Sequence, residues 1–309
     1  MAARARLTSF YDNAYVVLPA ATLFWAGNVI ASRIAVGDVS PMVLTAFRWG
    51  VALVILAAVA RGPVTRDWAL LKGRWGYLAV MGTLGFTAFN AFYYVAAHYT
   101  SAVNIGIIQG GIPGLVFLIA YLARGTKAGR AQLFGMMVTL LGVAVVATRG
   151  DVSAIATLGF NVGDILMLGA CVSYAIYTVF LPDRPKVNGL TFFAGLAVTG
   201  FLSTLPLLAA EIALGEFQAP TAVGWATIAY CGVFPSVLSQ IFFVRGVELI
   251  GPGRAGVFVN LIPVFAAVLA VGVLGEPFHA YHGAALALVL GGILFAERAS
   301  RARAAAASP

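Results

Sequence analysis

The sequence predicts an all-α membrane protein: ten transmembrane helices form two inverted five-helix repeats around a central cavity, with both termini cytoplasmic. Its composition, its ten apolar runs and the distribution of its basic residues predict this fold. Of the 309 residues, 61% are hydrophobic and only 10% are charged, whereas an ordinary soluble domain has about 25% charged residues. A soluble chain of this length must cover its surface with more polar groups than this sequence supplies.

The apolar runs are long enough to cross a bilayer, which takes about 20 predominantly apolar residues per helix. The breaks between the runs are short and carry most of the polar residues. The predicted spans are 15–33, 41–60, 75–96, 102–121, 131–149, 161–181, 190–211, 224–245, 254–273 and 281–297. The first run follows two arginines and resembles a signal peptide, but Trp25 and Asn28 within it favour an uncleaved span. The Ala- and Arg-rich segment 299–309 is expected to be a disordered tail.

The basic residues predict the orientation of the spans. With the amino terminus in the cytoplasm and the loops alternating between sides, the cytoplasmic segments hold 16 of the 19 Lys and Arg residues. The opposite side receives only Arg33 and Arg149, and Arg48 lies inside the second span. Short cytoplasmic loops carry this kind of excess, so we expect a multi-pass protein of the inner (plasma) membrane.

A shift of 150 residues aligns the third and fourth spans with the eighth and ninth without a gap. The shift places Trp75 on Trp225 and Pro113 on Pro263. The loop charges of the two halves are reversed, so the predicted repeats 15–149 and 161–298 have opposite orientations. Inverted repeats are a common plan of secondary transporters, whose substrate sites lie near the midplane between the repeats.

Several segments, in their order and spacing, resemble the EamA-type ten-helix branch of the drug/metabolite transporter superfamily. They are Phe24-Trp25-Ala26-Gly27-Asn28, Pro41 through Phe47-Arg48, Gly163-Asp164-Ile165-Leu166 with Ser173-Tyr174-Ala175, and Gly251 to Pro263 with Leu274-Gly275-Glu276-Pro277. The resemblance covers about residues 15 to 298 and makes each half an EamA-like repeat. It implies export of small metabolites by alternating access, most notably of amino acids including aromatic ones, with YddG-like amino acid exporters among the candidates. The first half departs from the family pattern, because it has Gly125-Thr126 where a Gly-Glu pair is usual.

Polar and aromatic side chains inside the spans predict a pocket for a small amphipathic solute. Buried polar groups need partners, so each of these residues could instead pack against or hydrogen-bond to a neighbouring helix. The candidate substrate-binding residues are Trp25, Asn28, Arg48, Asn90, Tyr94, Gln109, Pro113, Tyr174, Tyr177, Gln240, Phe243, Asn260 and Pro263.

Prolines and charges inside the spans have two interpretations each. Pro113 and Pro263 predict helix breaks facing the cavity, or kinks that only shape the bundle. Arg48 could bind a substrate carboxylate with its guanidinium fork, or form a fixed pair with Asp164 or Glu276. These two carboxylates are candidates for proton coupling if burial raises their pKa values, or polar anchors at helix ends.

The sequence predicts no catalytic residue, metal site or cofactor. His279 and His282 have metal-ligand spacing but no evident third ligand, and with His98 they fall near loops where histidines are usually solvated. The scattered basic residues argue against nucleic acid, so the expected partners are a small-molecule substrate and the lipid bilayer. A monomer is compatible with the sequence, which leaves the oligomeric state open. An importer or exporter of other metabolites or drugs, an intramembrane enzyme, a passive channel and a receptor remain alternatives.

Overall fold

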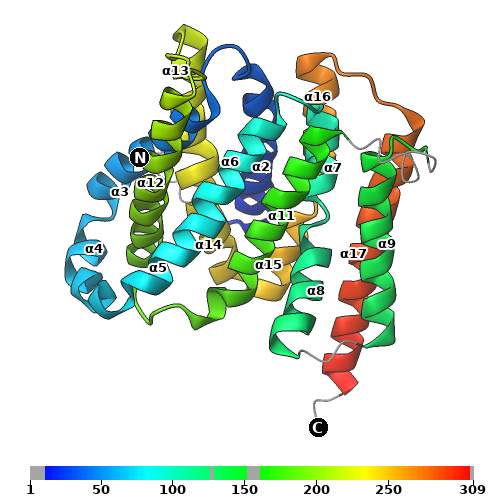
Figure 1. Cartoon of the computed structure of the whole chain (residues 1–309). Helices are drawn as coiled ribbons and strands as arrows, with labels where there is room; N and C mark the ends of the chain where they lie inside the picture. Colours follow the sequence, from blue (N-terminus) through cyan, green and yellow to red (C-terminus); the bar gives the residue numbers. More distant parts are fainter. Residues whose placement is uncertain (1–10, 126–128, 152–160, 307–309) are drawn as a thin grey trace, which may run out of the picture.

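The computed structural model describes residues 11–125, 129–151 and 161–306, and within these ranges all regular secondary structure is helical. Figure 1 shows the helices gathered into one bundle, with loops at its upper and lower ends. The α-helices are α2 (Ala14–Ile34), α3 (Pro41–Val59), α4 (Arg61–Asp67), α5 (Trp75–Gly82), α6 (Phe89–Ala96), α7 (Ala102–Gln109), α8 (Ile112–Arg124), α9 (Arg130–Ala147), α11 (Val162–Phe180), α12 (Gly189–Ala213), α13 (Ala222–Val233), α14 (Ser239–Ile250), α15 (Pro252–Val259), α16 (Ile262–Leu274) and α17 (Ala280–Ala306). Between them lie the 3-10 segments η1 (Trp68–Arg74) and η3 (Leu181–Asp183) and the π-helical turns η2 (Thr83–Ala88) and η4 (Phe234–Leu238).

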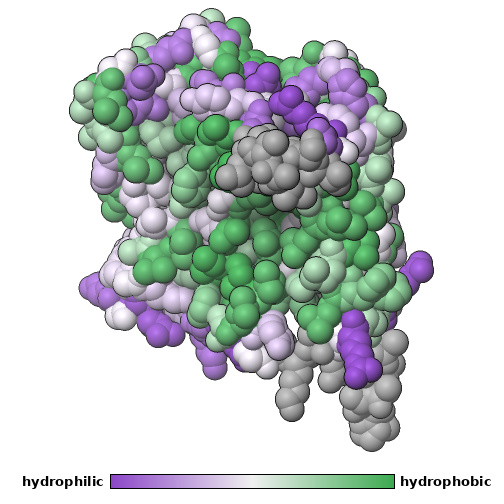
Figure 2. Space-filling view, turned by 45° about the vertical axis from the view of Figure 1, so that its right-hand side comes forward, coloured by the Kyte–Doolittle hydropathy of each residue, from purple (hydrophilic) through white to green (hydrophobic). Residues whose placement is uncertain are grey.

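Helix length and composition are those of a multi-pass membrane protein. In the described part of the chain, seven helical segments are long and apolar enough to cross a bilayer. They are Ala14–Ile34, Pro41–Val59, Arg61–Ala96, Ala102–Arg124, Val162–Asp183, Gly189–Ala213 and Ala222–Ile250, and the shorter apolar helices are Leu133–Ala147, Ile262–Leu274 and Ala280–Ala296. Hydrophobic side chains cover the middle of the face in Figure 2, and hydrophilic ones gather at its upper and lower margins. Exposed apolar surface of this extent marks contact with lipid rather than water.

Two of the predicted spans are broken at their prolines. The fourth span divides into α7 and α8 and the ninth into α15 and α16. Pro113 and Pro263 each occupy the second residue of the later half-helix, where the missing N–H has no intrahelical partner to lose. Gly125 and Gly275 then end these half-helices in the left-handed conformation, with φ of 60° and 65°.

The third and eighth spans contain π-helical turns that the sequence analysis did not predict. Residues 84–88 of η2 and 234–238 of η4 are separated by the same 150 residues that align the two halves of the sequence. A π-turn interrupts the regular i→i−4 hydrogen bonding and is frequent at functional sites. Both turns lie next to the polar cluster described below.

The end of the chain differs from the expected disordered tail. Helix α17 continues through the Ala- and Arg-rich segment to Ala306, because both residue types have high helix propensity. Residues 307–309 of that segment, Thr126 of the departing Gly-Thr pair and the amino-terminal arginines lie outside the described residues. Helices α9 and α17 run side by side along one edge of the bundle (Figure 1).

Candidate functional site

Arg48 lies in α3 with only 5% of its surface exposed, and it is the centre of a buried polar cluster. Its Nε and Nη2 both donate to Ser236 Oγ, at 3.0 and 2.8 Å. Its Nη1 donates to Asn90 Oδ1 at 2.7 Å, to Asn28 Oδ1 at 3.3 Å and to Tyr94 Oη. We call these five residues the Arg48 cluster. They come from α2, α3 and α6 in the first half and from η4 in the second, so the cluster joins the two halves.

The acceptors around Arg48 are themselves held in place. Tyr94 Oη donates to Asn28 Oδ1 at 3.0 Å, and Asn90 Nδ2 donates to the Phe86 carbonyl at 2.5 Å. Asn28, Asn90 and Tyr94 are at most 6% exposed. The structure therefore brings four of the predicted site residues into one hydrogen-bonded group.

Each of the two π-turns contributes a polar group to the cluster or its surroundings: η4 the Ser236 hydroxyl and η2 the Phe86 carbonyl. Ser236 Oγ donates to the Cys231 carbonyl five residues earlier, at 2.7 Å, and this carbonyl lacks its usual i+4 donor because residue 235 is a proline. Trp49 Nε1 donates to the Phe86 carbonyl of η2 at 3.3 Å. The sequence did not single out Ser236, Trp49 or Phe86. The signal that could have pointed to Ser236 is the neighbouring Pro235, a proline inside the predicted eighth span.

Arg48 forms no ion pair with any described residue, so of its two interpretations the fixed pair with Asp164 or Glu276 is wrong. Both carboxylates lie at helix ends and are bound to other groups, as described next. Burying a cation is costly unless it is paired or faces water. Arg48 donates five hydrogen bonds, but three of them share Nη1 and only one comes from Nη2, so one Nη2 hydrogen has no acceptor among the described residues. Arg48 is thus a buried positive charge held by neutral groups alone.

Asp164 lies in the first turn of α11 and belongs to a separate polar chain. Its carboxylate accepts from Thr100 Oγ1 at 2.5 Å and from Asn104 Nδ2 at 3.3 Å. Asn104 Oδ1 lies 3.1 Å from His282 Nε2. Because His282 Nδ1 accepts the backbone N–H of His279 at 3.1 Å, the ring proton sits on Nε2 and is donated to Asn104. His282 is only 2% exposed, so the expectation that it is solvated is wrong.

Glu276 caps the amino terminus of α7 from the opposite half of the chain. Its two oxygens accept the backbone N–H groups of Ala102 at 2.9 Å and Val103 at 3.0 Å. Arg33 Nε lies 3.7 Å from the same carboxylate. A helix amino terminus favours an anion, so the geometry is that of a helix-end anchor.

Two groups of aromatic residues lie next to the Arg48 cluster, one at Trp25 and one at Trp49. Trp25 and Phe243 have ring centroids 5.4 Å apart, and Trp25 Nε1 donates to the Pro235 carbonyl of η4 at 3.2 Å.

In the second group, Trp49 stacks on Phe86 at 4.2 Å, and Phe86 contacts Tyr177 at 6.1 Å. Tyr174 continues this row, 5.4 Å from Tyr177. The candidate aromatic residues therefore form two groups next to Arg48 rather than a single stack.

The remaining candidates lie at or near the helix breaks. Gln109 is the last residue of α7, and its buried Oε1 has no hydrogen-bond partner among the described residues. Asn260 lies in the break between α15 and α16, and Pro113 and Pro263 are the second residues of α8 and α16. Gln240 is half-buried in the first turn of α14. The side-chain hydrogen bonds of Arg48 to described residues go to the Arg48 cluster and do not include Gln109 or Gln240.

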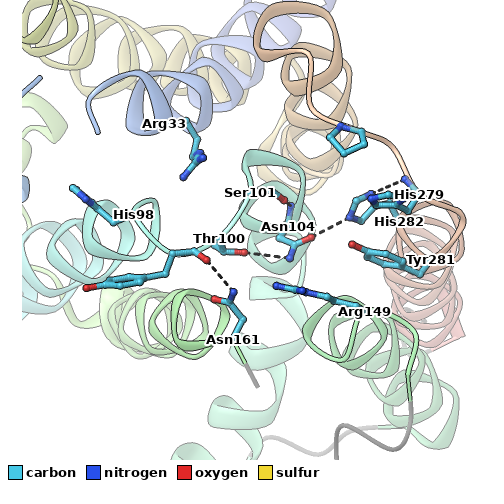
Figure 3. Close-up of a pocket in the computed structure, with 12 residues that line it drawn as sticks. Arg33, His98, Thr100, Ser101, Asn104, Arg149, Asn161, His279, Tyr281 and His282 are labelled. Atoms are coloured by element: carbon cyan, nitrogen blue, oxygen red, sulfur yellow. Dashed lines mark hydrogen bonds between the residues drawn. The ribbon is translucent and has the colours of Figure 1, made fainter. Parts of the chain in front are cut away.

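A separate cavity of about 560 Å³ opens at the upper end of the bundle, and we call it the vestibule (Figure 3). Its lining includes Arg33, His98, Asn104, Arg149, His279 and His282. Arg33 and Arg149 are the two basic residues that the charge distribution assigned to the outer side. Partial burial, followed by the nearby Arg33, lowers the pKa of His98, so this ring is neutral at pH 7. Within the described residues, no group of three or more His, Cys, Asp or Glu side chains could hold a metal.

Comparisons with known proteins give one consistent relationship. The model of the EamA-like transporter family matches residues 13–148 and 161–297. The uncharacterized transporters YyaM and YetK of Bacillus subtilis are 27% and 26% identical, over 92% and 91% of this chain and 93% and 86% of their own lengths. A probable terminal-alkyne amino-acid exporter of Streptantibioticus cattleyicolor is 25% identical over 90% of this chain and 91% of its own. A solved crystal structure at 20% identity covers 93% of this chain and 97% of its own, with a TM-score of 0.64, and shows a shared fold.

Proposed function

Because the chain belongs to the EamA-like transporter family of the drug/metabolite transporter superfamily, we propose that it exports small organic carboxylates by alternating access. Amino acids, including aromatic ones, are the substrates we expect first. The observation that carries this proposal is Arg48, a buried cation between the two halves whose partners are all neutral. The amino-acid exporter among the relatives supports the same class of substrate.

The Nε and Nη2 atoms of Arg48 form the guanidinium edge that binds a carboxylate through two parallel hydrogen bonds. In the structure, a single oxygen, Ser236 Oγ, accepts from both atoms. A substrate carboxylate would replace this hydroxyl and supply the negative charge that the cluster lacks. Ser236 belongs to the second half, whereas Asn28, Asn90 and Tyr94 belong to the first. Rocking of the halves would therefore exchange Ser236 for substrate while the other partners keep Arg48 in position.

The aromatic groups next to the cluster suit the apolar part of such a substrate. Trp25 and Phe243 form one group, and the row from Trp49 through Phe86 to Tyr177 forms the other. Apolar walls with a few convergent polar groups are typical of small-molecule sites. This arrangement supports an amphipathic solute over an inorganic ion.

We further propose that ten spans form two inverted repeats in the inner membrane, with both termini cytoplasmic. The distribution of the basic residues supports this topology, and the matching offsets of the helix breaks and π-turns support the repeat. Attaching a reporter to each terminus tests the orientation. Labelling of either terminus from outside intact cells would contradict it.

Uptake into proteoliposomes tests the function. The panel contains labelled L-phenylalanine and L-leucine, with phenethylamine and isoamylamine as matched amines that lack the carboxylate. We expect saturable flux of the amino acids and competition between them, with little flux of the amines. An imposed proton gradient that increases this flux would make Asp164 and Glu276 the residues to test for coupling. Flux of amines alone, or of no carboxylate in a broad metabolite panel, would contradict the proposal.

A further inference from the structure

We propose that the vestibule is a second binding site, which takes small carboxylates and is separate from the Arg48 cluster. The inference concerns equilibrium binding at the upper end of the bundle, so it does not require that the chain transports its ligand. The cavity of about 560 Å³ falls within the usual size range of ligand pockets. No residue of the Arg48 cluster lines it.

Arg149 lines the cavity and has a strained backbone conformation, which indicates a functional role for its side chain. Arg149 follows the end of α9 with a φ of 53°, and it is the one non-glycine residue with positive φ among the described residues. Its N–H bonds the Val146 carbonyl, and the N–H of Gly150 bonds the Val145 carbonyl. Helices usually place glycine or asparagine at such a left-handed position. Strained residues of this kind cluster at functional sites, and Figure 3 shows the Arg149 side chain reaching across the vestibule.

The charges around the vestibule leave Arg149 available to an anion. Glu276 is occupied by two backbone N–H groups and by Arg33. Asp164 is buried and accepts from Thr100 and Asn104, which both line the cavity. The Arg149 guanidinium has no hydrogen bond or ion pair with any described residue, and Asp164 attracts it only through a longer-range charge interaction.

Two of the three histidines that line the vestibule do not compete for this role. His98 is neutral at pH 7, and His282 accepts at Nδ1 and therefore carries a single ring proton. The permanent positive charges of the lining are Arg33, which is paired with Glu276, and Arg149. Tyr99 and Tyr281 add aromatic surface to the same lining, which suits a carboxylate that carries an apolar or aromatic group.

A single introduced thiol can report occupancy of the vestibule. Tyr99 lines the cavity with 57% of its surface exposed, whereas the native Cys171 and Cys231 are fully buried. In the full-length Tyr99→Cys protein, we would measure the rate of labelling by neutral methyl methanethiosulfonate. Benzoate and benzylamine serve as probes, because they share the ring and similar size but carry opposite charges. We expect benzoate to slow labelling severalfold and benzylamine to leave the rate unchanged.

Two substitutions of Arg149, each made in the Tyr99→Cys protein, test the assignment. Arg149→Gln removes the charge, and Arg149→Gly also relieves the left-handed backbone. We expect both to raise the half-protecting benzoate concentration at least tenfold, and Arg149→Gly also to raise the melting temperature. If the Arg149 side chain served only to stabilise the fold, Arg149→Gly would not raise the melting temperature. Arg66→Gln, at an exposed arginine remote from the vestibule, should keep full protection.

Three results would overturn the inference: no protection by benzoate, equal protection by benzylamine, or unchanged protection in folded Arg149→Gln and Arg149→Gly proteins. Its failure is distinguishable from failure of the proposed function. Arg48→Gln should keep benzoate protection while losing carboxylate flux. Protection in a protein that transports nothing would support the vestibule and contradict only the transport proposal.

Discussion

The substitution Arg48→Gln separates a substrate-binding arginine from a structural one, because the structure predicts opposite effects on affinity and on folding. Each side chain around Arg48 keeps a hydrogen bond without the guanidinium, although Asn90 Oδ1 loses its donor. Tyr94 still donates to Asn28, Asn90 still donates to the Phe86 carbonyl, and Ser236 still donates to the Cys231 carbonyl. The substitution also removes a buried cation, whose burial opposes stability. We therefore expect a folded protein with a melting temperature close to that of the wild type.

The expected loss of affinity follows from the contact that the substrate would make. A hydrogen bond to a charged group contributes about 1.5–3 kcal/mol. Removing the guanidinium edge should therefore raise the half-saturation concentration for L-phenylalanine roughly 10- to 150-fold, since 1.4 kcal/mol is about tenfold. Arg48→Lys keeps the charge but loses the two-pronged edge, so we expect it to fall between the wild type and Arg48→Gln.

The assay is uptake of labelled L-phenylalanine by proteoliposomes, with gel-filtration profile and melting temperature as controls for folding. Arg66→Gln is the matched control, because the Arg66 side chain is 72% exposed and pairs only with its neighbour Asp67. It should leave the half-saturation concentration unchanged. A folded Arg48→Gln protein with wild-type half-saturation and unchanged preference for phenylalanine over phenethylamine would refute the reasoning.

Two further predictions concern contacts between helices. Glu276→Gln replaces one of the two oxygens that accept from Ala102 and Val103 with an NH2 group, which cannot accept, and it removes the ion pair with Arg33. It should therefore destabilise the protein by about 1–3 kcal/mol; in thermal unfolding, a melting temperature as high as that of the exposed control Glu216→Gln would contradict this. Gly292→Ala places a methyl group 2.5 Å from the Gly135 carbonyl oxygen between α9 and α17 and should lower stability by about 1–3 kcal/mol, whereas Gly291→Ala meets nothing within 4 Å and should not. Equal melting temperatures for these two alanine variants would show that the helix pair tolerates the added volume.

Much of the fold could be predicted from the sequence because a membrane span must satisfy its backbone hydrogen bonds within itself. That requirement makes each span a readable apolar run, and it makes Pro113 and Pro263 visible as interruptions. The same logic indicated four members of the Arg48 cluster. A charged or amide side chain within an apolar run is expensive to bury and therefore suggests a site.

The partners of these groups required the tertiary structure. Ser236 lies 188 residues from Arg48, and its hydroxyl contacts the guanidinium from the π-turn η4 of the second half. The sequence left open whether Arg48 pairs with Asp164 or Glu276, and packing decided against both by placing each carboxylate against other groups.

For the vestibule too, local sequence predicted the side of the membrane and packing determined the site. The charge distribution assigned Arg33 and Arg149 to one side of the membrane, since loop charge depends on local sequence alone. Whether the two arginines share a cavity depends on how helices distant in sequence pack together. Hydropathy is a property of each segment, and it determined the spans; the distances between side chains are properties of the packed bundle, and they determined the sites.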